Sequence, residues 1–182
     1  MKIIKTDIPD VLIFEPAVFG DERGFFMETF RESFFEGLGL GVRFVQDNHS
    51  SSVKGVLRGL HYQLKCPQGK LVRVANGSVY DVVVDVRKRS SYFGMYVGAI
   101  LSEDNRRIMW VPPGFAHGFL VISDQAEFIY KCTDYYAPEF ERSLAWDDPE
   151  VNIAWPLEQV GSPSLSSKDE QGILLADLEV FE

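Results

Sequence analysis

The sequence has few of the residues that build covalent cross-links or transition-metal sites. It contains only two cysteines, Cys66 and Cys132, and three histidines, His49, His61 and His117. The two cysteines lack the spacing of a zinc site. One disulfide is possible in principle, but two free thiols in a reducing cytosol is the simpler interpretation.

Basic residues and long apolar runs are also scarce. Lys and Arg total 18 against 27 Asp and Glu, which gives a formal net charge of −9. This balance argues against general nucleic-acid binding, although a local basic pocket for one anionic ligand remains compatible with it. No stretch reaches the ~18 consecutive apolar residues of a membrane helix. Asp7, Pro9 and Asp10 interrupt the segment where a signal peptide needs an apolar run, so we expect a cytoplasmic protein.

Short apolar segments separated by turn residues recur through most of the chain. The hydrophobic fraction of 46% is typical of a globular protein, and we expect one domain over residues 1–182. The pattern predicts an all-β sandwich or barrel, with a hairpin turn at Asn76-Gly77 and one early helix over residues 31–37. Residues 148–182 are interrupted by prolines and predict looser structure. The expected strands cover residues 11–14, 24–30, 42–45, 55–63, 71–75, 79–86, 96–101, 107–111, 118–122 and 127–133.

The segment RGLHYQ, residues 58–63, is the most informative single stretch. Its alternation predicts a half-buried strand with Gly59, His61 and Gln63 on one face. A histidine there suits proton transfer near neutral pH, although a hydrogen-bonded structural histidine is the commoner case. In a regular strand the side chains of Arg58 and His61 would point to opposite faces. If both side chains serve one site, Gly59 must allow a bulge or Arg58 must lie at the rim.

A second informative segment, WVPPGFAHGF, spans residues 110–119. Its Pro-x-Gly-x-x-His pattern builds a tight turn before His117 and resembles the second motif of the cupin superfamily. The first cupin motif usually carries a His-x-His pair, but here Gln63 follows His61 in the second position. With so few histidines and no evident carboxylate, the sequence does not predict a transition-metal site. A turn-locking core residue is the alternative interpretation of His117.

Three further ionisable residues lie in the predicted strands or near the C-terminus. Tyr130 would ordinarily be a core tyrosine with its hydroxyl satisfied. Lys70 is less ordinary, because lysines are seldom buried unless they are paired. Asp169 would by default cap or solvate a C-terminal segment. Each therefore has a structural interpretation beside a functional one.

Eight ordered blocks give the chain a resemblance to a known family. They are GDERGFFMETF, FVQDNHS, GVLRGLHYQ, PQGKLVRV, GSVYDVVVDVRKRS, PPGFAHGF, YKCTDYYAPEFE and LSSKD, and they extend from about residue 18 to about residue 170. In this order they resemble the dTDP-4-dehydrorhamnose 3,5-epimerase family of nucleotide-sugar epimerases. The resemblance implies a metal-free cupin jelly roll, or double-stranded β-helix, with a few short helices. It also implies a homodimer that uses no cofactor.

The resemblance also implies a reaction and its catalytic residues. The substrate is dTDP-4-dehydro-6-deoxy-D-glucose, whose C4 ketone acidifies the protons at C3 and C5. Inversion needs a base on one face, an acid on the other and a group that holds the enolate oxygen. His61 resembles the general base and Asp169 the carboxylate that orients it. Tyr130 resembles the acid on the opposite face, and Lys70 the cation near the C4 oxygen.

Further positions match the family's binding residues. Arginine suits bidentate contact with the diphosphate, and Arg23 and Arg58 match the anion-binding positions. Glu28, Gln46 and Asn48 match nucleotide or sugar contacts, and Tyr136 matches an aromatic contact. His117 matches a second histidine of the site, and the resemblance does not assign its role.

Three other functions remain open from the sequence. A relative could invert only C3 or only C5. A non-catalytic sugar-binding cupin is disfavoured because mere binding needs no acid and base. A metal-dependent cupin is disfavoured by Gln63.

Overall fold

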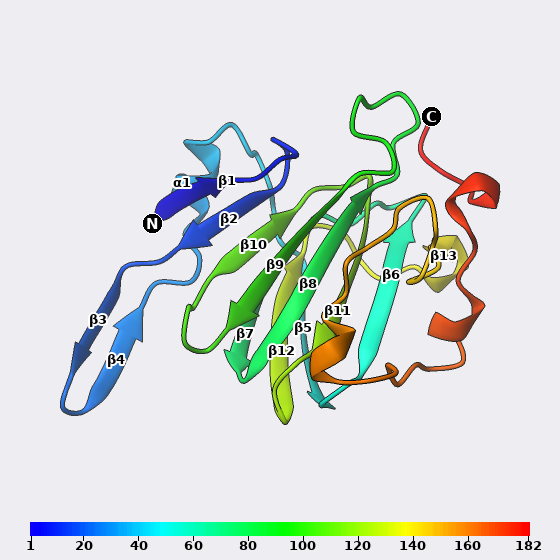
Figure 1. The fold of residues 1–182 in the computed structure, drawn as a ribbon. Helices are drawn as coiled ribbons and strands as arrows, with labels where there is room; N and C mark the ends of the chain where they lie inside the picture. Colours follow the sequence, from blue (N-terminus) through cyan, green and yellow to red (C-terminus); the bar gives the residue numbers. More distant parts are fainter.

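The computed structural model describes residues 1–182 and contains two antiparallel sheets and a separate hairpin (Figure 1). In spatial order, the first sheet contains β1 (Lys2–Lys5), β2 (Leu12–Glu15), β10 (Ile108–Val111), β7 (Lys70–Asn76), β12 (Gln125–Cys132) and β5 (Gln46–Val53). The second contains β13 (Glu141–Ser143), β6 (Leu57–Gln63), β11 (Phe115–Val121), β8 (Ser78–Asp85) and β9 (Tyr96–Ser102).

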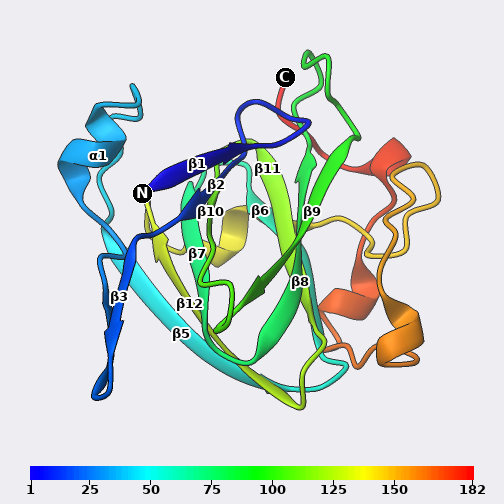
Figure 2. The ribbon, with the colours of Figure 1, turned by 60° about the vertical axis from the view of Figure 1, so that its left-hand side comes forward.

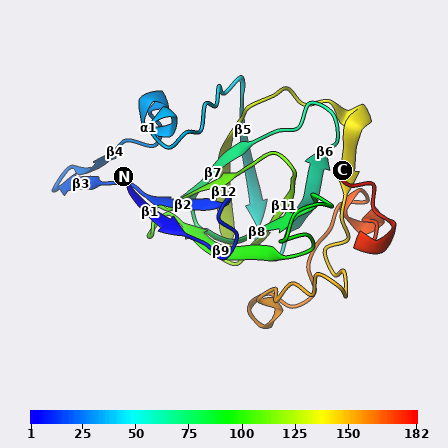
Figure 3. The same cartoon turned by 90° about the horizontal axis from the view of Figure 1, so that it is seen from above.

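The two sheets face each other and curve into an open barrel (Figures 2 and 3). Apolar side chains from both inner faces form the main core, among them Val72 and Phe128 from one sheet and Val83 and Phe119 from the other. All four are at most 5% exposed. This packing of two sheets confirms the predicted all-β jelly roll of the cupin type.

The C-terminal part of the chain covers the outer face of the five-stranded sheet, as the orange and red segments of Figure 1 show. Leu60 and Tyr62 of β6 pack there against Trp155, Leu175 and other apolar side chains. Beyond β13 the regular structure is limited to the short 3-10 turns η2 (Leu157–Gln159), η3 (Asp169–Gln171) and η4 (Leu175–Asp177); η1 (Pro138–Phe140) precedes β13. The looser structure predicted for residues 148–182 is therefore confirmed.

The early helix is confirmed as α1 (Glu32–Glu36), but the strand predicted at residues 42–45 is wrong. Those residues form an irregular segment. Val42 and Phe44 contribute to a small apolar cluster with Phe35 of α1 and Trp110 of β10. The apolar residues in 42–45 are thus explained by loop packing against a helix, which a short apolar run does not distinguish from a strand. No helix in the structure is long and apolar enough to cross a membrane.

The hairpin predicted at Asn76-Gly77 is also wrong, although a turn does occur there. Gly77 has a φ of 75°, a conformation that favours glycine. The strands on either side do not pair with each other: β7 pairs with β10 and β12, whereas β8 pairs with β9 and β11. The turn therefore carries the chain from one sheet to the other.

The apolar pattern did not predict β3 (Val18–Asp21), which pairs with β4 (Gly24–Met27) in a separate hairpin. The hairpin extends away from both sheets, at the lower left of Figure 1. Phe19, Phe25 and Phe26 are 67%, 57% and 71% exposed. The Arg106 guanidinium stacks 4.0 Å from the centroid of the Phe25 ring, and the three rings together leave an exposed aromatic surface on the hairpin.

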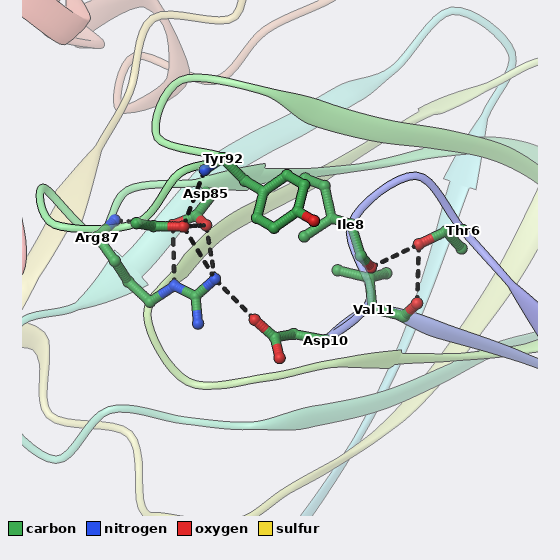
Figure 4. Close-up of polar contacts among 8 residues, drawn as sticks. Thr6, Ile8, Asp10, Val11, Asp85, Arg87 and Tyr92 are labelled. Carbon is green, nitrogen blue, oxygen red and sulfur yellow. Dashed lines mark hydrogen bonds and ion pairs between the residues drawn. The ribbon is translucent and has the colours of Figure 1, made fainter.

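A network of ion pairs attaches the turn between β1 and β2 to the barrel (Figure 4). The Arg87 guanidinium donates to the buried Asp85 carboxylate, with an Nη2–Oδ2 distance of 2.6 Å, and lies 2.8 Å from Oδ2 of Asp10. It also stacks 4.4 Å above the Phe115 ring. A side chain at Gly114 would clash with Arg87. The network therefore fixes the start of β11, the strand that carries His117.

Candidate active site

A cavity of about 400 Å³ lies between the two sheets and contains most of the predicted site residues. The predicted residues that line it are Gln46, Asn48, Arg58, His61, Lys70, His117, Tyr130, Tyr136 and Asp169. The edge strand β5 has polar residues on both faces, and its alternate positions Gln46, Asn48 and Ser50 face the cavity. This explains why β5 was missed as a strand: neither face carries an apolar pattern.

His61 and Asp169 form a close pair on the wall that β6 provides. Nε2 of His61 lies 2.9 Å from Oδ1 of Asp169. Burial lowers the pKa of His61, and the contact with Asp169 only partly opposes that shift. Burial would raise the pKa of Asp169, but the contact with His61 and the hydrogen bonds from Ser166 and Gly59 outweigh it and hold this pKa well below its usual range. The pair therefore consists of a neutral imidazole and a carboxylate at neutral pH, as a general base requires.

A β-bulge places Arg58 and His61 on the same side of β6. Arg58 pairs with Phe119 and His61 with His117, so β6 has one more residue than β11 in this interval. Gly59 lies in the bulge with a φ of 129°, and a Cβ there would lie 2.5 Å from the Cα of Gly118. Of the two alternatives that the parity of Arg58 and His61 allowed, the bulge is thus present, and it needs glycine on both strands.

Tyr130 and Lys70 lie on the six-stranded sheet, on the opposite side of the cavity from His61. Burial raises the pKa of Tyr130, so its hydroxyl remains protonated at neutral pH. Lys70 is paired in register with Cys132, two residues beyond Tyr130 on β12. Its Nζ lies 3.5 Å from the carbonyl oxygen of His61, and burial lowers its pKa. The Tyr130 hydroxyl group and the Lys70 amine therefore belong to side chains that line the same cavity as His61.

His117 forms a second histidine–carboxylate pair, with Asp81 of β8. Its Nε2 is 3.0 Å and 3.1 Å from the two carboxylate oxygens. Asp81 is fully buried, and His117 is the only group that hydrogen-bonds to its carboxylate. Burial raises the pKa of Asp81, and the positive charge of His117 opposes that shift. The Nε2 atom of His117 is thus occupied by Asp81, which holds the imidazole ring in place at the cavity wall.

Comparison with known proteins connects this arrangement to one family. The family model described as dTDP-4-dehydrorhamnose 3,5-epimerase matches residues 5–177. The enzyme of that name from Pseudomonas aeruginosa is 56% identical over 182 residues, which cover 100% of this chain and 99% of the relative. The chain belongs to the dTDP-4-dehydrorhamnose 3,5-epimerase family.

Solved structures of 3,5-epimerases and of a related monoepimerase have the same fold. The enzyme from Legionella pneumophila, solved in complex with dTDP-4-keto-L-rhamnose, is 52% identical with a TM-score of 0.95, covering 98% of this chain and 94% of that one. A 3'-monoepimerase from Streptomyces bikiniensis, in complex with dTDP-quinovose, is 34% identical with a TM-score of 0.88. It covers 94% of this chain and 87% of its own. The fold is thus shared by epimerases of different stereochemical outcome.

Two residues that match the family's binding positions, Arg23 and Glu28, do not line the cavity. Arg23 lies in the β3–β4 hairpin, where it pairs with Asp21 and is 84% exposed. Glu28 follows the hairpin and lies 3.4 Å from Arg31 at the surface. Within one chain, therefore, Arg23 and Glu28 do not join the nine other predicted site residues that line the cavity.

Several cavity residues were not predicted. Glu141 and Lys168 form an ion pair of 2.5 Å at the cavity, and Ser166 and Gln68 also line it. Both charged residues lie in blocks that carry the family resemblance: Glu141 is within YKCTDYYAPEFE and Lys168 within LSSKD. Charged residues in short, turn-rich segments are usually solvated, and only the fold shows that these two meet.

The structure contains no group of three or more His, Cys, Asp or Glu side chains that could hold a metal ion. Both His61 and His117 direct Nε2 at a carboxylate from a different part of the chain. A metal-free enzyme remains a prediction, which elemental analysis together with assays after chelation would check.

Proposed function

We propose that this epimerase inverts C3 and C5 of dTDP-4-dehydro-6-deoxy-D-glucose through an enolate and uses no cofactor. His61 removes the proton, Asp169 stabilises the imidazolium that forms, and Tyr130 returns a proton from the opposite side. Lys70 and His117 hold the developing negative charge on the C4 oxygen. We propose a cytoplasmic location as well, because both cysteines are free thiols.

The observation that carries this proposal is the placement of the two proton carriers on opposite walls of one cavity. His61 extends from β6 of the five-stranded sheet, and Tyr130 from β12 of the six-stranded sheet. A sugar ring between them presents one face to each. Inversion requires removal and return of the proton on opposite faces, whereas a binding protein has no use for such a pair.

Incubation with the dTDP-4-keto sugar in heavy water tests the reaction directly. The expected result is deuterium incorporation at both C3 and C5, together with the inverted product. Incorporation at neither carbon would contradict the proposed activity.

Inversion of only one carbon is the second candidate, because a 3'-monoepimerase shares this fold. The same experiment distinguishes the two, since a monoepimerase would form product inverted at a single carbon.

The remaining binding residues support a nucleotide-sugar substrate. Arg58 lies at the cavity rim, where its Nε donates to Ser52 Oγ at 3.0 Å and leaves two guanidinium nitrogens for phosphate oxygens. Lys168 supplies a second cation at the cavity. Gln46, Asn48 and Tyr136 line the same cavity with polar and aromatic groups suited to the nucleotide and the sugar.

We infer that the chain forms a homodimer in which the β3–β4 hairpin reaches a second copy. The exposed Phe19, Phe25 and Phe26 need a covering surface. Arg23 and Glu28 do not line their own cavity, and in this arrangement they contact a nucleotide bound to the partner. In the outer face of the six-stranded sheet, the half-buried Arg73 has no ion-pair partner, and burial lowers its pKa. Such a face also suits contact with another copy.

Light scattering at micromolar concentration tests the oligomeric state. The expected mass is about twice the chain mass of 20.6 kDa. Replacing Phe26 by Ser should weaken the dimer, because it removes an exposed ring from the hairpin. A monomer with full activity at the same concentration would contradict the dimer.

A further inference from the structure

The amide of Gln63 joins two segments at the rim of the cavity. Gln63 ends β6 and is only 4% exposed. Its Nε2 donates to the carbonyl oxygens of Cys66 at 2.8 Å and Tyr135 at 3.2 Å. Its Oε1 accepts a hydrogen bond from the Ala137 backbone N–H at 2.9 Å. Gln63, which occupies the second position of the cupin His-x-His pattern, therefore forms its side-chain hydrogen bonds with backbone groups.

The two joined segments, residues 64–69 and 133–137, are further connected to each other. The backbone N–H of Gly69 donates to Thr133 Oγ1 at 2.7 Å. In return, the Thr133 N–H donates to the Gly69 carbonyl at 2.9 Å. Nε2 of Gln68 donates to the carbonyl oxygen of Asp134 at 2.9 Å. Both segments supply cavity residues, namely Gln68 from the first and Tyr136 from the second.

Tyr136 depends on its backbone for its position. Its side chain is 52% exposed, so packing holds the ring only in part. Its N–H donates to Gln46 Oε1 at 3.0 Å, and its hydroxyl donates to Glu141 Oε2 at 2.9 Å. Gln63 binds the residues immediately before and after it, Tyr135 and Ala137. The amide therefore fixes the peptide groups on both sides of the aromatic residue.

We propose that Gln63 is a positioning residue that holds Tyr136 at the cavity for catalysis. The proposal rests on the epimerase activity proposed above. Only an uncharged amide supplies two donors and one acceptor at this place. A glutamate of the same shape would retain the acceptor for Ala137 but would place a negative charge against two carbonyl oxygens. A leucine would leave all three backbone groups without their partner in a buried site.

Hydrogen–deuterium exchange of the backbone tests the structural part without any substrate. In Gln63→Leu, we expect faster exchange in residues 133–137 than in the wild type, because Ala137 loses its acceptor. Gln63→Glu should show less increase at Ala137, since it keeps that acceptor. Gln125→Leu is a matched control: Gln125 donates to Ser51 Oγ, does not line the cavity, and should leave exchange in residues 133–137 unchanged.

Kinetics of a double-mutant cycle test the positioning role. Gln63→Leu should lower kcat/KM roughly 10- to 100-fold, as a displacement of about 1 Å in a substrate contact does. If Gln63 acts through Tyr136, the double variant Gln63→Leu/Tyr136→Ala should be no worse than Tyr136→Ala alone. The pH profile of kcat should keep its acid limb, because His61 remains intact. Gln63→Asn provides a milder variant if the leucine protein does not fold.

Independent effects of the two substitutions, or unchanged exchange in residues 133–137, would overturn the proposal. A shifted acid limb would also overturn it, since Gln63 would then act through His61. The exchange data remain decisive even when the wild-type protein shows no epimerase activity. In that case the proposed function fails, while the role of Gln63 in holding residues 133–137 is tested separately.

Discussion

His61→Asn should abolish deuterium uptake at both C3 and C5, with a loss in turnover of about 10²- to 10⁴-fold or more. Asparagine fills much of the space of the imidazole and can still contact Asp169, but it cannot accept the substrate proton. Nucleotide binding should survive, because the groups suited to the diphosphate and the base lie elsewhere around the cavity. Isothermal titration with dTDP measures that binding, and NMR in heavy water measures the exchange.

His49→Asn is the matched control for this variant. His49 lies on β5 but does not line the cavity, its side chain is 55% exposed, and it contacts Glu127 at 3.4 Å. Its replacement should leave exchange and turnover at wild-type levels. Near-normal turnover in His61→Asn would remove this residue from the role of base.

The surroundings of the two cavity histidines favour His61 over His117 as the proposed base. Asp169 accepts hydrogen bonds from the Gly59 N–H and from the Ser166 N–H and hydroxyl, so its charge is stabilised without a protonated histidine. Asp81 has only His117. His61 can therefore be neutral before the reaction, whereas the carboxylate of Asp81 depends on His117 alone for its side-chain hydrogen bonds. The two pairs look alike in composition and differ in the number of donors around each carboxylate.

Sequence reasoning recovered the parts of the fold that have a local signal. The apolar strands, the helix near residue 35 and the bulge at Gly59 each follow from periodicity or parity within a few residues. It failed at β5, whose cavity face is polar because it contributes to the site, and at Asn76-Gly77, where both flanking strands pair elsewhere. Turn chemistry specifies a change of direction, but strand pairing depends on distant segments.

The candidate site was predicted through ordered motifs more than through the properties of single residues. Taken alone, Tyr130 and Asp169 each had an ordinary structural explanation. Asp81 illustrates the limit: within GSVYDVVVDVRKRS nothing distinguishes it from a strand residue, and only the pairing of β8 with β11 brings it to His117. For Arg23 and Glu28 the motif indicates a binding role, but neither residue lines the cavity of its own chain.

Tyr130→Phe should separate proton exchange from inversion. The substitution keeps the ring and its packing near Phe128 but removes the hydroxyl that faces the cavity. His61 and Asp169 remain intact on the other wall, so the substrate should still lose protons to solvent. The variant should bind nucleotide and incorporate deuterium, but it should form little inverted product. NMR analysis of the recovered sugar measures exchange and configuration in the same sample.

Tyr92→Phe is a suitable control, because Tyr92 is half-buried in the loop between β8 and β9 and does not line the cavity. The Tyr92→Phe variant should invert both carbons at the wild-type rate.

The result for Tyr130→Phe depends on which side of the sugar ring receives the returning proton. A base on one wall can return a proton only to the face from which it came, so exchange without inversion is the expected signature of a missing second donor. Inversion of both centres at the wild-type rate by Tyr130→Phe would show that another group donates. His117 would then be the first residue to examine, because its side chain lines the same cavity and its Nε2 contacts Asp81.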